Sequence, residues 1–358
     1  MSTSAVPGHN ARMTPVPPNS PAKPLALTMG DACGIGPEII AKLYLGPDAA
    51  DCVVVGDVDV MRRAAGWVGG LLPVARIEAV ADLAHVPPRC IPVLQVQALD
   101  AGLLQARLGR VDARAGAAAA ASIRRAVQLA LDGEIAGIVT APIHKEALSA
   151  AGVGFLGHTE MLQALAWSGP LPPPPVRMML ANDQLSTVLV TIHMSLRKAI
   201  AAVTFDSVLQ TICMAHDAAA RWGRPNPRIA VAGLNPHAGE GGLFGDEEIQ
   251  TIGPAVQAAR AMGIDARGPF APDTVFMRAR NAPGHPGEFD IVIAMTHDHG
   301  LIPVKYLGIE QGVNVTLGLP FVRTSPDHGT AFDIAGKGLA DVQSLQAAVR
   351  MARRLSAP

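Results

Sequence analysis

Short apolar runs alternate with longer segments of mixed apolar and polar residues along most of this chain. Apolar runs of this length, bounded by Gly, Pro and polar residues, are typical of buried strands, whereas apolar positions that recur every three or four residues indicate helices. On this basis we predict strands at residues 24–28, 52–55, 136–140, 176–180, 187–192, 228–232 and 290–295, and helices from about residue 37 and at 111–132, 205–221 and 246–262. Alternation of the two kinds of element favours an α/β fold with mostly parallel sheets covered by helices on both faces.

The composition narrows the class of protein. A chain of 358 residues with 49% apolar and only 16% charged residues predicts two α/β domains and a large core, an oligomer interface, or both. The net charge of −1 and the aromatic content of 4% argue against nucleic acid and membrane surfaces as partners. Four scattered cysteines without a C-x-x-C pair indicate reduced thiols in a cytoplasmic protein. Residues 1–24, rich in Pro, Ser and Ala, are predicted to form a disordered tail.

Three histidines come at or shortly after the ends of three different predicted strands. They are His193, His237 and His297. Strands of one sheet bring their carboxyl ends together, and α/β proteins place ligands there. Three converging imidazoles describe a divalent-metal site with open positions for a substrate. One histidine in such a position is as often a satisfied core group, so this prediction depends on the repetition.

Other motifs allow a structural and a functional interpretation. The segment 28–38 (TMGDACGIGPE) lies between a strand and a helix, where its amides face either an anion or another backbone. In 157–160 (GHTE), Thr159 either caps a helix behind a surface His158, or both side chains donate hydrogen bonds to a carboxylate or phosphate. In the Gly-rich loop around His237, the acidic run that begins at Asp246 fits a helix cap and first-turn carboxylates, a structural role.

The last quarter of the chain concentrates polar side chains between apolar runs. Lys305, Asn314 and Arg323 are joined by runs that indicate buried strands, and a loop containing Gly and Asp follows at residues 328–336. Soluble proteins rarely hold so many polar groups around core strands unless the groups converge on something charged. We therefore expect a small anionic substrate held beside a metal and a nucleotide.

These motifs resemble those of the 4-hydroxythreonine-4-phosphate dehydrogenase family, NAD-dependent enzymes of pyridoxal 5′-phosphate biosynthesis. The resemblance runs from about residue 24 to the end of the chain. It is carried by GIGPE at 34–38, GHTE at 157–160, NPHAGE at 235–240, HDxG at 297–300 and GVNVTLGLPFVRTSPDHGTAFDIAGKG at 312–338.

The resemblance implies a fold like that of the isocitrate and isopropylmalate dehydrogenases, with the active site in a cleft between two α/β domains of a homodimer. The first domain, on the cofactor side, is expected to comprise residues 25–150 plus about 320–358. The second is expected to comprise residues 151–319 and to carry the metal, substrate and dimer contacts.

The same resemblance implies roles for individual residues. The expected metal is one divalent ion, such as Zn, Co, Mg or Mn, and its expected ligands are His193, His237 and His297. The expected substrate contacts are His158, Thr159, Lys305, Asn314 and Arg323. The candidate catalytic residues are Lys305, which would bind an anionic group, and Asp298, which would act as a base or orient a histidine. NAD, or NADP, falls to His328, Gly329, Thr330 and Asp333.

The expected reaction is oxidation of 4-hydroxy-L-threonine 4-phosphate to a β-keto acid, followed by decarboxylation. The chain departs from the family's usual pattern at Thr296 and His299, where Tyr and Gln are common, and at Ala32-Cys33, where Pro-Ala is common. Dehydrogenation of D-threonate or D-erythronate 4-phosphate is therefore an alternative, and a cis-dihydrodiol is a less favoured one. A metallohydrolase and a sensor without activity are the alternatives from other classes of function.

Overall fold

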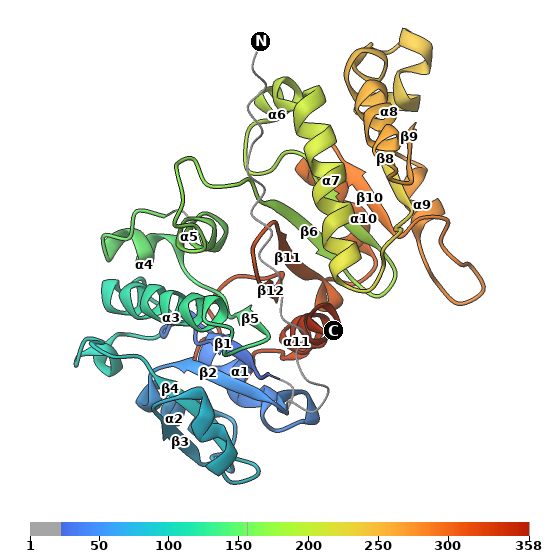
Figure 1. Cartoon of the computed structure of the whole chain (residues 1–358). Coiled ribbons are helices and arrows are strands. Elements are labelled where there is room, and N and C mark those ends of the chain that lie inside the picture. The colour runs from blue at the N-terminus through green and yellow to red at the C-terminus, as the bar shows by residue number, and fades with distance from the viewer. Residues whose placement is uncertain (1–22, 156, 358) are drawn as a thin grey trace, which may run out of the picture.

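The computed structural model describes residues 23–155 and 157–357 (Figure 1). The predicted disordered tail falls almost wholly on residues 1–22, which lie outside the described residues.

A twelve-stranded sheet runs through the described part of the chain, in the order β3-β4-β2-β1-β5-β12-β11-β6-β7-β10-β8-β9. The strands are β1 (Leu25–Thr28), β2 (Cys52–Gly56), β3 (Val74–Ile77), β4 (Ile91–Gln95), β5 (Gly137–Thr140), β6 (Arg177–Ala181), β7 (Ser186–Leu189), β8 (Ile229–Ala232), β9 (Ala266–Phe270), β10 (Ile291–Ala294), β11 (Val313–Leu317) and β12 (Val322–Pro326). Neighbours are parallel except at β12–β11, β11–β6 and β6–β7. The α/β fold class with mostly parallel strands is confirmed.

Helices cover the sheet. They are α1 (Gly36–Leu43), α2 (Val58–Trp67), α3 (Ala113–Leu131), α4 (Lys145–Ala150), α5 (His158–Leu165), α6 (Leu196–Ala202), α7 (Phe205–Arg221), α8 (Gly253–Ala261), α9 (Val275–Ala279), α10 (His297–Tyr306) and α11 (Gln343–Ser356). Short 3₁₀ turns are η1 (Pro47–Ala49), η2 (Val80–His85), η3 (Leu103–Gln105), η4 (Pro236–Gly242) and η6 (Ile309–Gln311), and η5 (Glu248–Ile252) is a π turn. No single described helix is long and apolar enough to cross a membrane; α6 and α7 pass that test only as a pair, bent by 83°.

The sheet divides at its middle into two halves. We call β3, β4, β2, β1, β5 and β12 the first half, and β11, β6, β7, β10, β8 and β9 the second half. Figure 1 shows the halves as two lobes, with α11 beside their junction, where it contacts β12, β5 and β11. The proposed division into domains near residues 150 and 320 stays a prediction.

The strand and helix predictions differ from the structure in a few informative places. The predicted helix 246–262 is confirmed as η5 and α8, which follow each other without a gap, and only its first part is a π turn, because Pro254 supplies no amide to the regular α-helical pattern. The predicted strand 187–192 ends at Leu189, although Val190 N still donates to Ala294 O at 2.9 Å. Strand β9 was not predicted, since Gly268 and Pro269 interrupt its apolar pattern.

Capping side chains and buried faces explain the helix that the sequence predicts best. Helix α7 begins after Thr204, whose hydroxyl accepts a hydrogen bond from Ser207 N at 3.2 Å, while Ser207 Oγ accepts one from Thr204 N at 2.9 Å. Its face that includes Val208, Ile212 and Ala215 is fully buried. The observed bounds are those predicted.

Candidate active site

A buried cation occupies the middle of the sheet. Arg323 on β12 is only 3% exposed, and its Nη1 and Nη2 donate hydrogen bonds to Thr316 Oγ1 at 3.1 Å and Thr140 Oγ1 at 2.7 Å. Its Nε has no partner, and no carboxylate among the described residues pairs with it. Burial lowers the pKa of Arg323 to about 10, so the guanidinium is charged at neutral pH. A buried charge without a counter-ion is costly, and this one is held ready for an anion.

His158 lies beside this cation. Gly157 occupies the N-cap of α5, so the interpretation of Thr159 as the helix cap is wrong. His158 is half-buried and not a surface residue, and its Nε2 is buried without a partner. Burial, and secondly the charge of Arg323, hold the pKa of His158 well below its usual range. A neutral imidazole and a guanidinium, each with a vacant nitrogen, therefore stand together as predicted for an anion site.

Two of the three predicted metal ligands come together. The ring centroids of His193 and His297 lie 5.6 Å apart, and both residues line a cavity of about 570 Å³ together with Asp298. Burial lowers the pKa of His193, with smaller contributions from the charges of Lys145 and His297. His193 is therefore neutral at lower pH than an ordinary histidine, and neutral imidazole is the form that binds metals.

Asp298 fixes the orientation of the second ligand. His297 Nδ1 lies 2.8 Å from Asp298 Oδ1, so Nδ1 carries the hydrogen and Nε2 is left with its lone pair. Carboxylate partners orient metal-binding histidines in this way. His193 has a φ of +40°, a left-handed conformation that is strained for a residue with a side chain. These features fit a divalent ion at His193 and His297.

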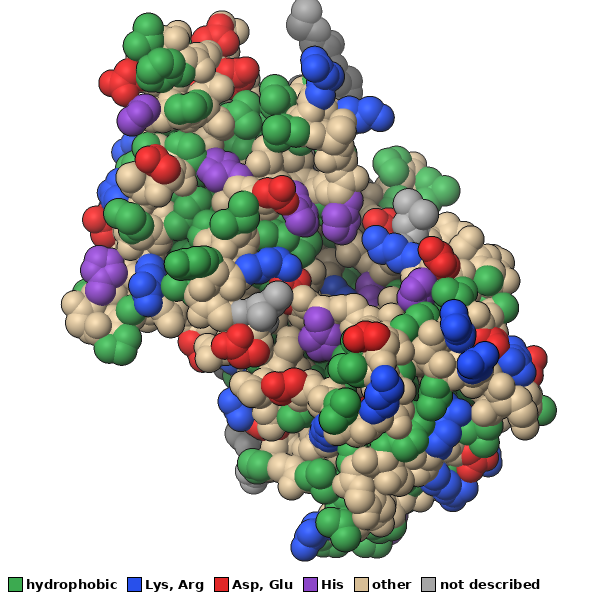
Figure 2. All heavy atoms as spheres, turned by 180° about the vertical axis from the view of Figure 1, so that it is seen from behind, with side chains coloured by type: hydrophobic (Ala, Val, Ile, Leu, Met, Phe, Trp, Pro, Cys, Tyr) green, Lys and Arg blue, Asp and Glu red, His purple; other side chains and the backbone are tan. Residues whose placement is uncertain are grey.

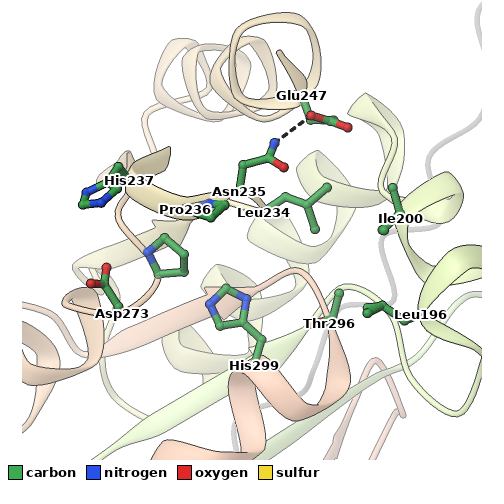
Figure 3. Close-up of a pocket in the computed structure, with 11 residues that line it drawn as sticks. Leu196, Ile200, Leu234, Asn235, Pro236, His237, Glu247, Asp273, Thr296 and His299 are labelled. Atoms are coloured by element: carbon green, nitrogen blue, oxygen red, sulfur yellow. Dashed lines mark hydrogen bonds between the residues drawn. The ribbon is translucent and has the colours of Figure 1, made fainter. Parts of the chain in front are cut away.

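His237 does not join this pair in the described structure. It lines a neighbouring cavity of about 560 Å³, and Figure 3 shows it at the rim while His299 points inward from α10. Thr296 and Leu196 line both cavities. Among the described residues, no group of three side chains of the ligand type is assembled.

Carboxylates shape the loop that carries His237. Glu248 is buried and accepts hydrogen bonds from Leu234 N at 2.6 Å and Asn235 N at 2.8 Å. Asn235 Nδ2 donates to Glu247 Oε2 at 2.6 Å, as Figure 3 shows. The structural role predicted for this acidic run is confirmed, although Glu247, and not Asp246, takes the N-cap position.

Lys305 is paired with a carboxylate that the sequence did not single out. Its Nζ lies 2.7 Å from Asp327 Oδ2, although the direction of approach gives that oxygen no hydrogen bond. Asn314 lies half-buried on β11, next to β12. The three predicted anion ligands of the last quarter thus come from α10, β11 and β12.

The loop 328–336 packs against the first glycine-rich motif. Ile35 N donates to Thr330 O at 3.0 Å, and a Cβ at Gly34 would lie 2.9 Å from Thr330 Cβ, so only glycine fits. Thr330 is buried, whereas His328, Gly329 and Asp333 are exposed. The motif 28–38 therefore meets another backbone, which supports its structural interpretation.

Two polar residues near the site were missed. Asp31 is buried after β1, and His144 follows β5. The rule that selected the other histidines, a position just after an apolar strand, applies equally to His144. For Asp31 the available signal was a carboxylate inside an otherwise apolar turn. Figure 2 shows histidines gathered along a hollow between the two lobes.

The fold and these groups define an α/β protein with an anion site beside a pair of metal-type ligands. The sequence model of the pyridoxal phosphate biosynthetic protein PdxA family matches residues 48–352. A 4-hydroxythreonine-4-phosphate dehydrogenase of Beijerinckia indica subsp. indica is 55% identical over 336 residues, which cover 94% of this chain and 96% of the relative. A D-threonate 4-phosphate dehydrogenase of Salmonella typhimurium is 43% identical over 93% of this chain and 99% of its own.

A solved structure agrees with these relatives. The crystal structure of 4-hydroxythreonine-4-phosphate dehydrogenase from Klebsiella pneumoniae has a TM-score of 0.84 and 43% identity, covering 94% of this chain and 99% of that chain. The chain belongs to the PdxA family of dehydrogenases, oxidoreductases that act on a CH–OH group. The resemblance inferred from the motifs is confirmed.

Proposed function

We propose that this protein oxidises 4-hydroxy-L-threonine 4-phosphate, with a nicotinamide cofactor and a divalent metal, to a β-keto acid that then loses carbon dioxide. The observation that carries the proposal is the buried guanidinium of Arg323 with its vacant Nε beside His158. A phosphorylated acid supplies the anion that this arrangement lacks. A cis-dihydrodiol without an acidic group does not, which argues against the uncharged form of that alternative.

Different polar side chains bind the different anionic groups of the substrate. Arg323 and His158 hold one anionic group of the substrate, and the first turn of α5, which includes Thr159, adds its free amides. Lys305 and Asn314 approach from the other side and bind the second anionic group. With both ends fixed, the secondary hydroxyl is presented to the cavity of His193 and His297.

The metal ligands are His193 and His297, with His237 as the third by resemblance to the family. A bound divalent ion would lower the pKa of the substrate hydroxyl and polarise the new carbonyl. Asp298 keeps the hydrogen of His297 on Nδ1, and so keeps Nε2 free. In this proposal Asp298 orients a ligand and is not the general base.

The cofactor side is the loop 328–336, where His328, Gly329, Thr330 and Asp333 are the proposed contacts. These residues would hold a nicotinamide cofactor, NAD or NADP, which would supply the hydride acceptor for oxidation of the substrate carbon. The backbone packing of Thr330 against Ile35 holds this loop against the first half of the sheet.

Exposed apolar side chains support a homodimer. Several lie on α6, which lines the cavity of Figure 3, in the loop after His237, or in η5. They are Leu196, Ile200, Leu243, Phe244 and Ile249, which are 65%, 43%, 72%, 48% and 56% exposed. Light scattering on the purified protein should give a mass twice that of the chain, and the mass of a single chain would contradict this assignment.

The proposal is tested by following NADH formation with a divalent metal and 4-hydroxy-L-threonine 4-phosphate, in parallel with D-threonate and D-erythronate 4-phosphates. Arg323→Met should lower kcat/KM by a factor of about 100 or more, since a hydrogen-bonded charge pair with the substrate is lost. Arg177→Met is the matched control, because Arg177 is also partly buried and bonds a threonine hydroxyl, Thr211 Oγ1 at 2.8 Å, outside the site.

The outcomes separate the candidates. Turnover of the amino acid alone supports the proposal, and preference for a sugar acid replaces it with the activity named for the Salmonella relative. No reduction of NAD or NADP with any of the three substrates would overturn both. Equal losses of kcat/KM in the Arg323 and Arg177 variants would show that Arg323 has no specific role in binding the substrate anion.

A further inference from the structure

Two polar side chains with buried, unpartnered atoms, Asp31 and His144, follow adjacent strands of the first half. Strands β1 and β5 pair in parallel, with Thr28 opposite Thr140, and the chains that leave them stay together because Asp31 N donates to Pro142 O at 2.9 Å. This places the carboxylate of Asp31 and the imidazole of His144 at the same end of the sheet.

Asp31 is a buried carboxylate with half of its hydrogen-bonding capacity unused. It is 1% exposed; Oδ1 accepts a hydrogen bond from Cys33 N at 2.8 Å, while Oδ2 is buried without a partner. The charged groups that face it are His144 and Asp112, and the latter is already paired with Arg114 at 2.6 Å. Among the described residues, the imidazole of His144 is thus the facing group that favours the charged carboxylate.

His144 is held in place by packing and not by hydrogen bonds. Its ring stacks on Phe332, with centroids 4.6 Å apart and planes inclined by 11°, and its Nδ1 is buried without a partner. It occupies the N-cap of α4 without capping it. Helix α4 is fixed against α3, because a Cβ at Gly116 would lie only 2.0 Å from Ala147 O.

The start of α4 faces both sides of the site. Among the charged groups, Lys145, the next residue, does most to lower the pKa of His193, which belongs to the second half. Phe332, on which His144 stacks, belongs to the loop 328–336. His144 therefore stands between the buried carboxylate and the loop that carries the proposed cofactor contacts.

We propose that Asp31 and His144 form a carboxylate–imidazole pair that positions the loop 328–336, through the stack on Phe332, to bind the dinucleotide. A proton on Nδ1, shared with Oδ2 through one buried water, satisfies both vacant atoms. His144 is a positioning residue in this account, and Asp31 fixes its tautomer and charge. The inference rests on the nicotinamide cofactor of the proposed function.

Three variants separate the pair from simple packing. His144→Phe keeps the ring and its stack but removes Nδ1, His144→Asn keeps a donor near Nδ1 but removes the ring, and Asp31→Asn keeps the shape but removes the charge. His216→Phe is the matched control, because His216 on α7 also has a buried, unpartnered Nδ1 and lines neither cavity of the site.

The readout is NADH affinity, measured by fluorescence titration from pH 5 to 8, with thermal unfolding of each variant as a check on folding. We expect His144→Phe and Asp31→Asn to weaken NADH binding about tenfold, the loss of one charged hydrogen bond, with KM for the phosphorylated substrate unchanged. Wild-type affinity should change near pH 6, where burial places the pKa of Asp31, and Asp31→Asn should lack that step.

Each result decides the question. Unchanged NADH affinity in folded His144→Phe and Asp31→Asn variants would overturn the inference and leave the proposed function standing. Weakened NADH binding in these variants, without turnover of any phosphorylated acid by the wild type, would leave the inference and overturn the proposed function. A wild-type protein that binds no NADH would overturn both.

Discussion

At the residue scale, this molecule keeps charges where they cost stability. Among the described residues, Arg323 is buried without a paired carboxylate, and Asp31 is buried without a paired lysine or arginine. Protein interiors normally neutralise or pair such groups. The guanidinium of Arg323 bonds Thr140 at the carboxyl end of β5, and Asp31 follows the carboxyl end of β1. Buried charges at these positions indicate that the protein loses some stability in favour of ligand binding.

Asp31 should make this cost measurable. Burial, opposed by the Cys33 amide and His144, raises its pKa from 3.8 to about 6. Between these values the folded protein keeps a proton that the unfolded chain has released, so stability falls as pH rises from about 4 to 6. Above pH 6 the full penalty, on the order of 3 kcal/mol, remains. Asp31→Asn should therefore be more stable than wild type at pH 8.

Urea unfolding of both proteins between pH 4 and 8 checks this expectation. The advantage of the Asp31→Asn variant should shrink steadily as pH is lowered from 6 towards 4. A stability difference that is independent of pH would show that folding does not shift the pKa of Asp31.

At the element scale, helix α1 is tied to the segment that follows the loop 328–336 by a buried carboxylate. Glu38 is fully buried and accepts hydrogen bonds from Ala340 N at 2.8 Å and Gly338 N at 3.2 Å. Lys42, one turn later, lies 3.2 Å from Glu38 and donates to the carbonyl oxygens of the same two residues. The GIGPE motif is therefore a device that joins two elements about 300 residues apart.

Glu38→Gln should weaken this joint. The amide keeps the shape but presents a donor where two backbone amides need acceptors, so we expect a loss of about 2 kcal/mol in the free energy of unfolding. Asp59→Asn, which breaks the exposed Arg62–Asp59 pair at 2.9 Å, is the control and should change stability by less than about 0.5 kcal/mol. Equal changes in the free energy of unfolding of the two variants would show that Glu38 does not stabilise the contact between α1 and the segment around Gly338.

Elements and site residues were predictable to different degrees. The strands β1, β5, β8 and β10 are short apolar runs buried on both faces, which is the pattern that sequence reveals most clearly. Edge strands such as β3 carry exposed residues and lack that pattern. Loop conformation was not predictable, because it depends on contacts distant in sequence.

The three histidines illustrate that limit. Strands β7 and β10 are neighbours, and His193 and His297 follow them within a few residues, so their rings meet. Strand β8 also borders β10, but the loop after it runs through left-handed residues, with a φ of +52° at His237, and carries that side chain to the next cavity. A histidine that follows a strand can be expected to meet the histidine after a neighbouring strand only where the segment between strand and histidine is short.

At the scale of the whole molecule, an ion pair joins the two halves. Lys305 belongs to α10 in the second half, and Asp327 directly follows β12 in the first. A substrate anion that binds Lys305 must compete with this carboxylate. Asp327→Asn should therefore lower KM for the phosphorylated substrate about threefold, a modest effect because the lysine is partly exposed.

Lys305→Met is the companion variant and should raise the same KM at least about tenfold, since the cation itself is lost. Steady-state kinetics of both variants under saturating cofactor provides the measurement. A higher KM in Asp327→Asn would contradict the competition and make Asp327 a residue that steers Lys305 towards the substrate.

Strand direction reverses at the middle of the sheet, so β5 and β10 run in opposite senses. In a flat sheet their carboxyl ends would lie on opposite edges. Adjacent strands are rotated by about 20–25°, and over the five steps from β5 to β10 this amounts to roughly 100–125°. The coiling of the sheet turns the two sets of ends towards each other. The spacing between Lys145, which follows β5, and His193, which follows β7, thus depends on the twist of the sheet.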